Sequence, residues 1–446
     1  MIVVFKAVNQ KDLAVAQLTF DPADLTRFCR LEDVGLVATG QIVTEDEAVI
    51  ECRMAVADNF CGGCGAQGRV RDSERRRIVH VPFGHRPTYL LIRVRRYACG
   101  YCHRVWRQDI SNLVAPRQKL TRAALYWALV SLVEKHMSVS QIAKSLGVAW
   151  HTVNDAVLEE ARTALFSDPA RLEGVRVVGV DEHVWTHKRR SKFVTVIIDL
   201  TPVRDQRGPA RLLDVVEGRT KAALQQWLHE RPQGWRDGVE FVAMDGFTGY
   251  KTAAAEELPN AVAVMDPFHV VHLAADGLEK TRQRVQQDVY GHRGRAGEPL
   301  YGHRRIMLTG WPLLGDRQQD RLNELFTKEE FTEVWATWEF YQDIIAAYRD
   351  PNRTRGRAKM EEVIKAIGSG IPKELVELAK LGRTLKRRAE DILAYFGNPH
   401  TSNGPTEAIN GRLEHLRGIA YGFRNLANYI ARCLLESGGF KTALHP

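Results

Sequence analysis

The order of strands and helices expected between residues 171 and 276 restricts the fold of this 446-residue chain more than any other feature. Three apolar, β-branched stretches follow one another closely, and a helix, a strand, a second helix and a further strand come after them. In order, these segments read VRVVGVDEHVW, KFVTVIIDL, ARLLDVVEG, TKAALQQWLHE, VEFVAMD, GYKTAAAEEL and NAVAVMDPFHVV. This order predicts an antiparallel meander that continues into an α/β unit with a mixed sheet.

Two of these strands are expected to end on a carboxylate. The element order is that of the ribonuclease-H-like fold, in which the first and fourth strands are neighbours, so Asp181 and Asp245 should meet at one end of the sheet. A late helix with Pro405 in its first turn offers Glu407 as a third acid. Three carboxylates at one point repel one another unless cations bind them. For Asp181 alone, a solvated strand end is the alternative interpretation.

Such a carboxylate group is suited to phosphodiester chemistry. Two Mg²⁺ (or Mn²⁺) ions roughly 4 Å apart can activate a water or a 3′-hydroxyl and stabilise the leaving oxygen. The sequence therefore predicts that Asp181, Asp245 and Glu407 are both the catalytic residues and the ligands of two magnesium ions.

A second strand end competes with Asp245. Asp266 ends NAVAVMD, one strand further from Asp181, and a strand step of about 4.8 Å places its starting point roughly 10 Å away. We therefore expect Asp266 and His269 to flank the site, with His269 contacting a phosphate or the leaving 3′-oxygen and Asp266 orienting it. A turn-forming Asp before Pro267 is the alternative.

Four of the seven cysteines form two CxxC pairs. Paired knuckles of this kind supply four thiolates to one tetrahedral zinc, although the spacer between the pairs is longer than usual and would have to form a hairpin. We predict a structural Zn²⁺ site, with unmetallated core cysteines as the alternative. The expected ligands are Cys61, Cys64, Cys99 and Cys102.

The segment that contains these cysteines carries the chain's whole charge imbalance. The net charge is +9, and residues 61–119 hold thirteen Arg and Lys against three acids, which gives +10. A concentrated basic segment indicates a polyanion partner, here double-stranded DNA, while a solvated basic surface is the alternative. The expected DNA contacts are Arg75, Arg76, Arg77, Arg93, Arg95 and Arg96.

A helix-turn-helix pattern follows the basic segment. A short helix is expected from about Val139, a turn at Gly147 and a second helix from about Ala149. Residues near the start of a second helix of this kind read base edges, although a plain helical hairpin gives a similar pattern. The predicted base-contacting residues are Trp150, His151, Thr152 and Asn154.

The chain is therefore expected to be a multidomain α+β protein. No apolar run of about 18 residues and no signal peptide is evident, so we expect no membrane segment and a cytoplasmic location. The predicted regions are an N-terminal hairpin region (1–57), a zinc ribbon (58–110), a helix-turn-helix domain (115–166), the first part of the catalytic core (171–276), a helical insertion (277–395) and the C-terminal part of the core (396–446).

The motifs in this order resemble one known family. The zinc-ribbon segment, the helix-turn-helix and the stretches VGVDEHVW, VAMDGFTGYKTA, VMDPFHVVHLA and TSNGPTEAINGRLEHLRGIAYGFRN look like those of an insertion-sequence transposase of the ISL3 family, over nearly the whole chain from about residue 30.

The resemblance implies a DDE transposase. Asp181, Asp245 and Glu407 match its three acidic ligands, and DPFH, with Asp266 and His269, matches the D-x-x-H signature of related enzymes. It implies cleavage at the inverted-repeat ends of the element and then strand transfer, without a covalent protein–DNA intermediate. In the active complex we expect a homodimer or larger assembly, bound to element ends and target DNA in the bacterial nucleoid.

Two other functions remain open at the level of sequence. A domesticated regulator would use the zinc ribbon and helix-turn-helix without catalysis, and a structure-selective nuclease would share the catalytic fold. Strand transfer into a second duplex would distinguish a transposase from both.

Overall fold

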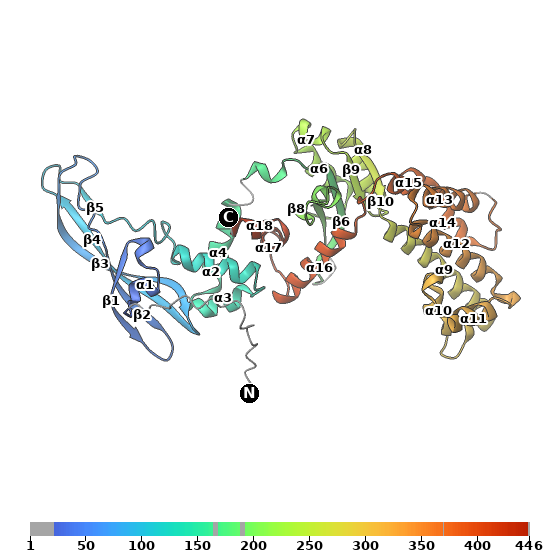
Figure 1. The fold of residues 1–446 in the computed structure, drawn as a ribbon, viewed down its shortest axis with the longest axis horizontal. Helices are drawn as coiled ribbons and strands as arrows, with labels where there is room; N and C mark the ends of the chain where they lie inside the picture. Colours follow the sequence, from blue (N-terminus) through green and yellow to red (C-terminus); the bar gives the residue numbers. More distant parts are fainter. Residues whose placement is uncertain (1–21, 164–167, 188–191, 369, 445–446) are drawn as a thin grey trace, which may run out of the picture. The chain divides into compact units, whose positions relative to one another are not determined.

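The computed structural model describes residues 22–163, 168–187, 192–368 and 370–444. The part of the predicted N-terminal region that covers residues 1–21 lies outside the described residues. Contacts divide the chain into two compact units (Figure 1). The first comprises residues up to Leu132 together with Val139–Val157, and the second contains the rest. Each is described by itself. None of the helices in the described ranges has the length and apolar character needed to cross a membrane.

The first unit is built on a five-stranded sheet with the strand order β1-β2-β4-β3, and β5 pairs with β4. The strands are β1 (Leu36–Val43), β2 (Ala48–Met54), β3 (Gly68–Phe83), β4 (Arg86–Cys99) and β5 (Val105–Arg107). Both predicted hairpins are present, because β1 pairs antiparallel with β2 and β3 pairs antiparallel with β4. A parallel pairing of β2 with β4 joins the hairpins into one sheet, with α1 (Leu25–Phe28) before it.

The helix-turn-helix follows the sheet. Helices α3 (Val139–Leu146) and α4 (Trp150–Ala161) occupy the two predicted segments, and α2 (Arg122–Val133) precedes them. Ile142, Leu146 and Val153 are buried, as expected for the core of such a motif. The turn requires Gly147, since its φ is +64° and an added Cβ would lie 2.4 Å from the Tyr89 hydroxyl.

The second unit contains a mixed sheet with the order β10-β9-β6-β7-β8. Its strands are β6 (Val177–Thr186), β7 (Lys192–Asp199), β8 (Arg211–Glu217), β9 (Phe241–Met244) and β10 (Val262–Met265). The meander β6–β7–β8 is antiparallel, and β9 and β10 are parallel to β6. The predicted fold class and the adjacency of the first and fourth strands are thus confirmed.

Helices between these strands cover the sheet. After α5 (Thr201–Arg204), α6 (Lys221–His229) and α8 (Thr248–Glu257) lie against it, with α7 (Gln233–Asp237) between them in sequence. Leu224, Trp227 and Tyr250 share a buried cluster with Val178 and Val180 of β6. Apolar side chains of the helices therefore pack on β6 as far as Val180, the residue before Asp181.

One sequence prediction about β6 is wrong. The strand was expected to end at Asp181, but it continues to Thr186. The reason is that β7 pairs with β6 from Val178 to Thr186, whereas the parallel pairing with β9 stops at Val180. Asp181 therefore lies at the end of the parallel part of the sheet, inside a longer hairpin.

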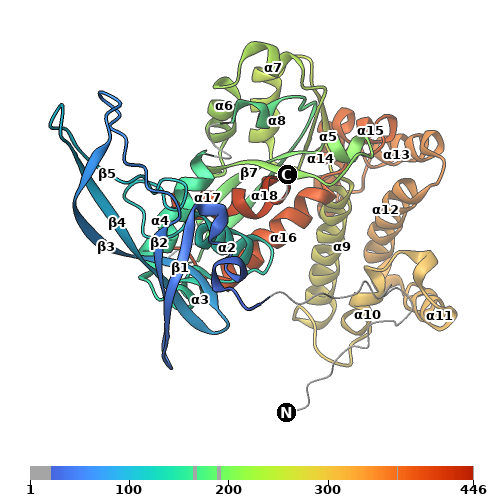
Figure 2. The same cartoon turned by 60° about the vertical axis from the view of Figure 1, so that its left-hand side comes forward.

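The described residues between 267 and 397 are mostly helical, and Figure 2 shows α9 beside α12. Helix α9 (Pro267–Tyr290) begins ten residues before the predicted start of the insertion, so it links the sheet to the helical region without a break. The other α-helices of this region are α10 (Pro299–Met307), α11 (Asp316–Leu325), α12 (Thr332–Arg349), α13 (Arg353–Ile367), α14 (Val376–Arg387) and α15 (Ala389–Gly397).

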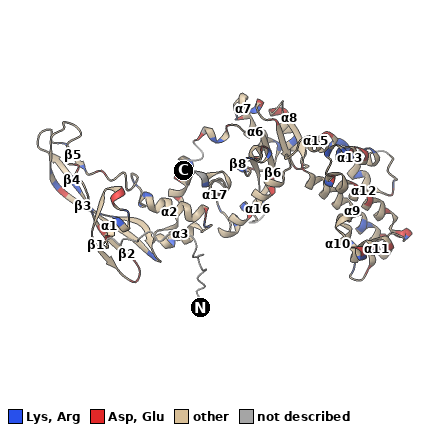
Figure 3. Ribbon diagram, in the orientation of Figure 1, with Lys and Arg blue, Asp and Glu red and all other residues tan. Residues whose placement is uncertain are grey.

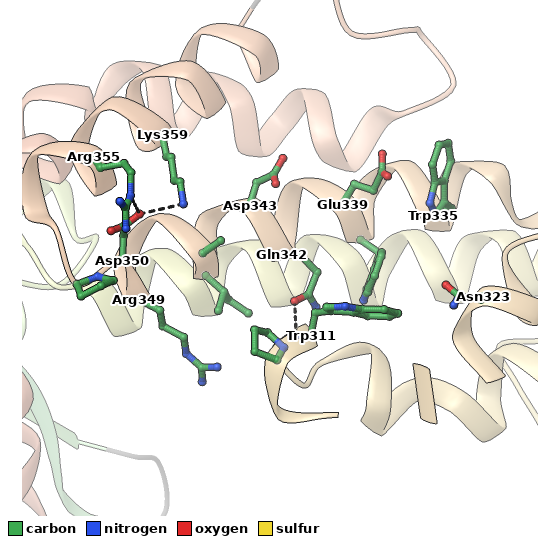
Figure 4. A pocket seen from close by; sticks show the side chains of 15 residues that line it. Trp311, Asn323, Trp335, Glu339, Gln342, Asp343, Arg349, Asp350, Arg355 and Lys359 are labelled. Atoms are coloured by element: carbon green, nitrogen blue, oxygen red, sulfur yellow. Dashed lines mark hydrogen bonds and ion pairs between the residues drawn. The ribbon is translucent and has the colours of Figure 1, made fainter. Parts of the chain in front are cut away.

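A cavity of about 810 Å³ lies in this helical region (Figure 4). Trp311, Trp335 and Trp338 line it together with the carboxylates of Glu339 and Asp343. The Gln342 side chain accepts a hydrogen bond from the Trp311 backbone N–H at 2.8 Å and so fixes one wall. After this region the chain returns to the sheet through α16 (Gly404–Ile419), α17 (Leu426–Ser437) and α18 (Phe440–Leu444).

Candidate active site and DNA-binding surfaces

The sheet register places two predicted catalytic residues side by side. Val180 of β6 pairs with Met244 of β9, and this is the last parallel pair. Asp181 and Asp245 each follow directly in the chain. The same register continues outward, because Met244 pairs with Met265 of β10 and Asp266 follows it. Three aspartates therefore lie in a row at one end of the sheet, in the order 181, 245, 266.

The carboxylate of Asp181 is buried, with 7% of the residue exposed. It accepts hydrogen bonds from the Glu182 backbone N–H at 2.8 Å and from Nδ2 of Asn410 at 2.9 Å. Burial, together with the negative charges of Asp245, Glu182 and Glu407, raises the pKa of Asp181 to about 7, although the hydrogen bond from the Glu182 N–H lowers it. Burial and like charges make the carboxylate form of Asp181 unfavourable, and a bound cation would offset this cost.

Glu407 lies in the first turn of α16 and is exposed. Its carboxylate forms a compact group with Asp266 and His269, in which one ligand atom from each lies within 4.8 Å of the others. Among the described residues, the predicted trio Asp181, Asp245 and Glu407 does not form a group this compact. The structure thus brings Asp181 beside Asp245 and groups Glu407 with the two residues expected to flank the site.

Asn403, just before α16, holds this helix against the sheet. Its backbone N–H donates to Oδ1 of Asp266 at 2.9 Å, and its Nδ2 donates to the Val180 carbonyl at 3.3 Å. Thr406 donates to Oδ1 of Asn403 at 2.5 Å. The approach also needs Gly179, where an added Cβ would lie 2.7 Å from the Thr406 hydroxyl oxygen.

Two of these residues were missed by sequence reasoning as parts of the site. Neither Asn403 nor Asn410 was predicted from the sequence to be part of the site. A signal for Asn410 existed, since it lies three residues after Glu407 and residues at that spacing share a helix face. Its Oδ1 is buried without a hydrogen-bond partner. Asn410 can therefore donate from Nδ2 to an ionised Asp181, and its Oδ1 is available to accept from a protonated one.

The helical region supports the loop that follows Asp245. Arg388, 3% exposed by side chain, pairs with Asp391 at 2.6 Å, and Asp391 also pairs with Lys251 of α8 at 2.9 Å. The Arg388 guanidinium lies 3.4 Å from the Gly246 carbonyl and 3.5 Å from the Asp245 carbonyl. The end of the predicted insertion therefore fixes the backbone of a predicted catalytic residue.

The four predicted zinc ligands form a compact group in the first unit, with Sγ atoms within 4.8 Å of one another. The Cys61–Cys102 and Cys64–Cys99 sulfur pairs are each 3.5 Å apart. A tetrahedral Zn²⁺ with bonds of about 2.3 Å separates its sulfur ligands by roughly 3.8 Å, so the site fits zinc closely. Backbone N–H groups of Cys102 and Tyr101 lower the pKa of Cys99 to about 6, which favours the thiolate.

The six predicted arginines lie on the β3–β4 hairpin, on which Figure 3 colours the basic residues. They are not equivalent. Arg96 binds Asp72 through two hydrogen bonds of 2.6 Å, and Arg77 pairs with Glu47 at 2.5 Å.

The remaining arginines differ in how freely they face the solvent. Arg75 lies 3.8 Å from Glu51, and Arg76 is half-buried. Arg93 and Arg95 are exposed and form no ion pair with a described residue, and the hydrogen bond of Arg93 Nε to the Ser73 hydroxyl at 3.1 Å leaves its charge unneutralised. Of the six, they are the two that are freest to contact phosphates.

The four predicted base-contacting residues also differ in exposure. Trp150 is 46% exposed and His151 is exposed, whereas Thr152 is half-buried. Asn154 is only 5% exposed. In this structure Trp150 and His151 are therefore the residues of this helix that are able to reach a base edge.

Comparison with known proteins gives the family. The DDE family model of ISL3 proteins, described as "Transposase", matches residues 178–433. The chain belongs to the ISL3 family of transposases. The zinc finger of the transposases IS204, IS1001, IS1096 and IS1165 matches residues 58–102, and the helix-turn-helix domain of ISL3 transposases matches residues 110–160.

Curated relatives of this ISL3 chain carry the same description. It is 26% identical over 385 residues to the transposase for insertion sequence element IS1001 of Bordetella parapertussis, which covers 82% of this chain and 86% of the relative. It is 24% identical over 331 residues to the transposase for element IS1557 of Mycobacterium tuberculosis, covering 69% and 70%. The chain is thus a transposase with a zinc ribbon, a helix-turn-helix and a DDE-family domain in that order.

The donor atoms at the sheet end suit divalent cations. Carboxylate oxygens of Asp181 and Asp245 are ligands that Mg²⁺ and Mn²⁺ prefer. The Oδ2 atom of Asp266 is buried without a hydrogen-bond partner, as a ligand atom would be before an ion binds. By contrast, the cavity of the helical region contains none of the predicted catalytic residues among its lining side chains.

Proposed function

We propose that this ISL3 transposase binds the inverted-repeat ends of its element and catalyses metal-dependent cleavage and strand transfer. The observation that carries the proposal is the buried Asp181, whose pKa is raised to about 7 by burial and by neighbouring acids that include Asp245 and Glu407. Such an arrangement costs free energy unless a cation binds there. Divalent ions at this position would activate the attacking oxygen and stabilise the leaving oxygen.

The proposed reaction has two steps. In the first, water attacks a phosphorus atom at the element end, the P–O3′ bond breaks, and the 3′-oxygen takes up a proton. In the second, that 3′-hydroxyl attacks a target phosphodiester, a new P–O bond forms, and the target 3′-oxygen leaves. No covalent bond to the protein is required in either step.

The chain's own residues have defined parts in this scheme. Asp181, Asp245 and Glu407 hold the charge that binds the divalent ions. Asn410 orients Asp181 through its 2.9 Å hydrogen bond, and Asn403 fixes the start of α16, which carries Glu407. We also propose that the active form is a homodimer or larger assembly on double-stranded DNA in the bacterial cytoplasm.

The test of the proposed function is a strand-transfer assay. Purified full-length protein, labelled DNA carrying the inverted repeat that flanks the gene, and supercoiled target DNA are mixed with Mg²⁺. We expect labelled DNA joined to the target. Cleavage without joining would indicate a structure-selective nuclease, and end-specific binding without cleavage would indicate a regulator.

A second prediction concerns DNA affinity. Replacing Arg93 and Arg95 together by Ala is expected to weaken binding and to reduce the log–log dependence of affinity on salt by about 0.9 for each phosphate that the variant no longer neutralises. The exposed positions of both side chains, without ion-pair partners among described residues, are the reason. Affinity measured by fluorescence anisotropy at several salt concentrations gives the slope.

The matched control is Arg77→Gln on the same hairpin. Arg77 is already paired with Glu47 and lies 3.8 Å above the Tyr89 ring, so its removal should change the salt slope much less. An unchanged slope in the double variant would show that Arg93 and Arg95 do not contact the DNA backbone.

A further inference from the structure

A mixed nitrogen and oxygen group stands out at the end of the sheet. Asp266 follows β10, His269 lies in the first turn of α9, and Glu407 lies in the first turn of α16. One donor atom from each lies within 4.8 Å of the others, about twice a metal–ligand bond of roughly 2.0–2.2 Å. One ion placed among them would therefore reach all three ligands with small side-chain adjustments.

Two atoms in this group lack the partners that buried polar atoms normally have. Asp266 is 2% exposed, and its Oδ2 has no hydrogen bond, although Oδ1 accepts from Asn403. The Nε2 atom of His269 is also buried without a partner. Unpaired buried polar atoms are rare in folded proteins, and an ion that is absent from a structure is one of the few explanations for them.

The surrounding helix ends do not argue against a cation. The first turns of α9 and α16 present backbone N–H groups, which favour negative charge. Here an N–H is used by a ligand, since Asn403 at the start of α16 donates to Asp266. This amide therefore stabilises the Asp266 carboxylate, and Asp266 and Glu407 together supply negative charge for an ion.

We propose that Asp266, His269 and Glu407 bind one first-row transition-metal ion, at a position distinct from the one between Asp181 and Asp245. An imidazole nitrogen favours ions such as Mn²⁺ or Zn²⁺ over Mg²⁺, which prefers oxygen ligands alone. The proposal deepens the proposed function, since Glu407 serves both, and so rests partly on it. It gives the D-x-x-H residues a role as ligands.

The experiment is Mn²⁺ binding to the full-length Asp181→Asn, Asp245→Asn variant with zinc bound at the cysteines. This variant removes the two acids of the neighbouring position and keeps all three proposed ligands. We expect about one bound Mn²⁺ per chain, and pulsed electron paramagnetic resonance should show hyperfine coupling to ¹⁴N. Adding His269→Ala should remove that coupling and weaken Mn²⁺ binding by at least about tenfold.

The control is His272→Ala in the same background. His272 is exposed and lies on the same helix, three residues further on, so its loss should leave both signals unchanged. Absence of ¹⁴N coupling before His269 is replaced, or its persistence afterwards, would overturn the proposal.

Failure of this inference is distinguishable from failure of the proposed function. Wild-type protein that performs strand transfer while the variant shows no ¹⁴N coupling would contradict the metal proposal alone. Conversely, ¹⁴N coupling from His269 in a protein that performs no strand transfer would uphold the metal site and contradict the proposed reaction.

Discussion

Asp245→Asn is expected to abolish both cleavage and strand transfer, by at least about 10³-fold, while binding to element ends persists. Asp245 follows the last residue of β9 and lies beside Asp181 in the parallel register, so it supplies one of the three negative charges proposed to bind the divalent ions. An amide of the same size keeps the fold but lacks that charge. Quantified cleavage and joining products, with DNA affinity measured in parallel, give the result.

Two variants make this prediction specific. Asp266→Asn keeps the oxygen that accepts from Asn403 and is expected to lower activity less than Asp245→Asn. Glu182→Gln changes an acid beside Asp181 that is paired with Arg219 at 3.1 Å, and it should retain most activity. If Asp245→Asn kept cleavage and Asp266→Asn lost it, the second catalytic acid would be Asp266.

The sequence was sufficient for the architecture because its signals are local. The order of strands and helices along the chain, the hairpin between the CxxC pairs and the turn at Gly147 follow from apolar periodicity and from single glycine or cysteine positions. The adjacency of β6 and β9 was predicted from the element order of the ribonuclease-H-like fold. The end of β6 was not predicted, since the polar run Asp181–His183 interrupts the apolar stretch and only the partner strand determines how far pairing continues. The residue pattern of one strand does not show how long its partner strand is.

The grouping of Asp266, His269 and Glu407 was beyond the sequence for a different reason. It depends on where α16 packs after a long helical region, and the deciding contact joins Asn403 to Asp266, 137 residues apart. Likewise, the sequence identified six arginines of one hairpin but not which of them are neutralised. Asp72 neutralises Arg96 and Glu47 neutralises Arg77, and these ion pairs depend on the strand register and on side-chain geometry.

Asp181→Asn is expected to stabilise the protein at pH 8 in buffer without Mg²⁺ or Mn²⁺, even though it removes a predicted catalytic acid. The raised pKa of Asp181, about 7, means that the folded protein holds a proton that the unfolded chain releases above its ordinary value of 3.8. The free energy that folding loses by burying the Asp181 carboxyl is therefore absent below about pH 4, grows between pH 4 and 7, and reaches its full value above pH 7. Replacing the Asp181 carboxyl by an amide should therefore raise the free energy of unfolding by roughly 2–4 kcal/mol at pH 8 and by little at pH 4.

The local contacts favour this substitution. An Asn side chain at 181 can still accept one hydrogen bond, and its amide can donate to Oδ1 of Asn410, which has no partner now. Calorimetric melting at pH 4 and pH 8 should show a Tm increase of about 5–10 °C at pH 8 only. Added Mg²⁺ should raise the Tm of the wild type more than that of the variant.

Asp199→Asn provides the opposite case in the same sheet. Asp199 is also buried, but its carboxylate pairs with Arg211 at 2.9 Å and accepts from the Thr201 N–H. Removing its charge leaves Arg211 without its partner, so this variant should lose stability at pH 8. A fall in Tm for Asp181→Asn as well would mean that the Asp181 carboxylate stabilises the fold without a cation. The buried acids of this sheet would then be structural, and the argument that Asp181 awaits a metal ion would fail.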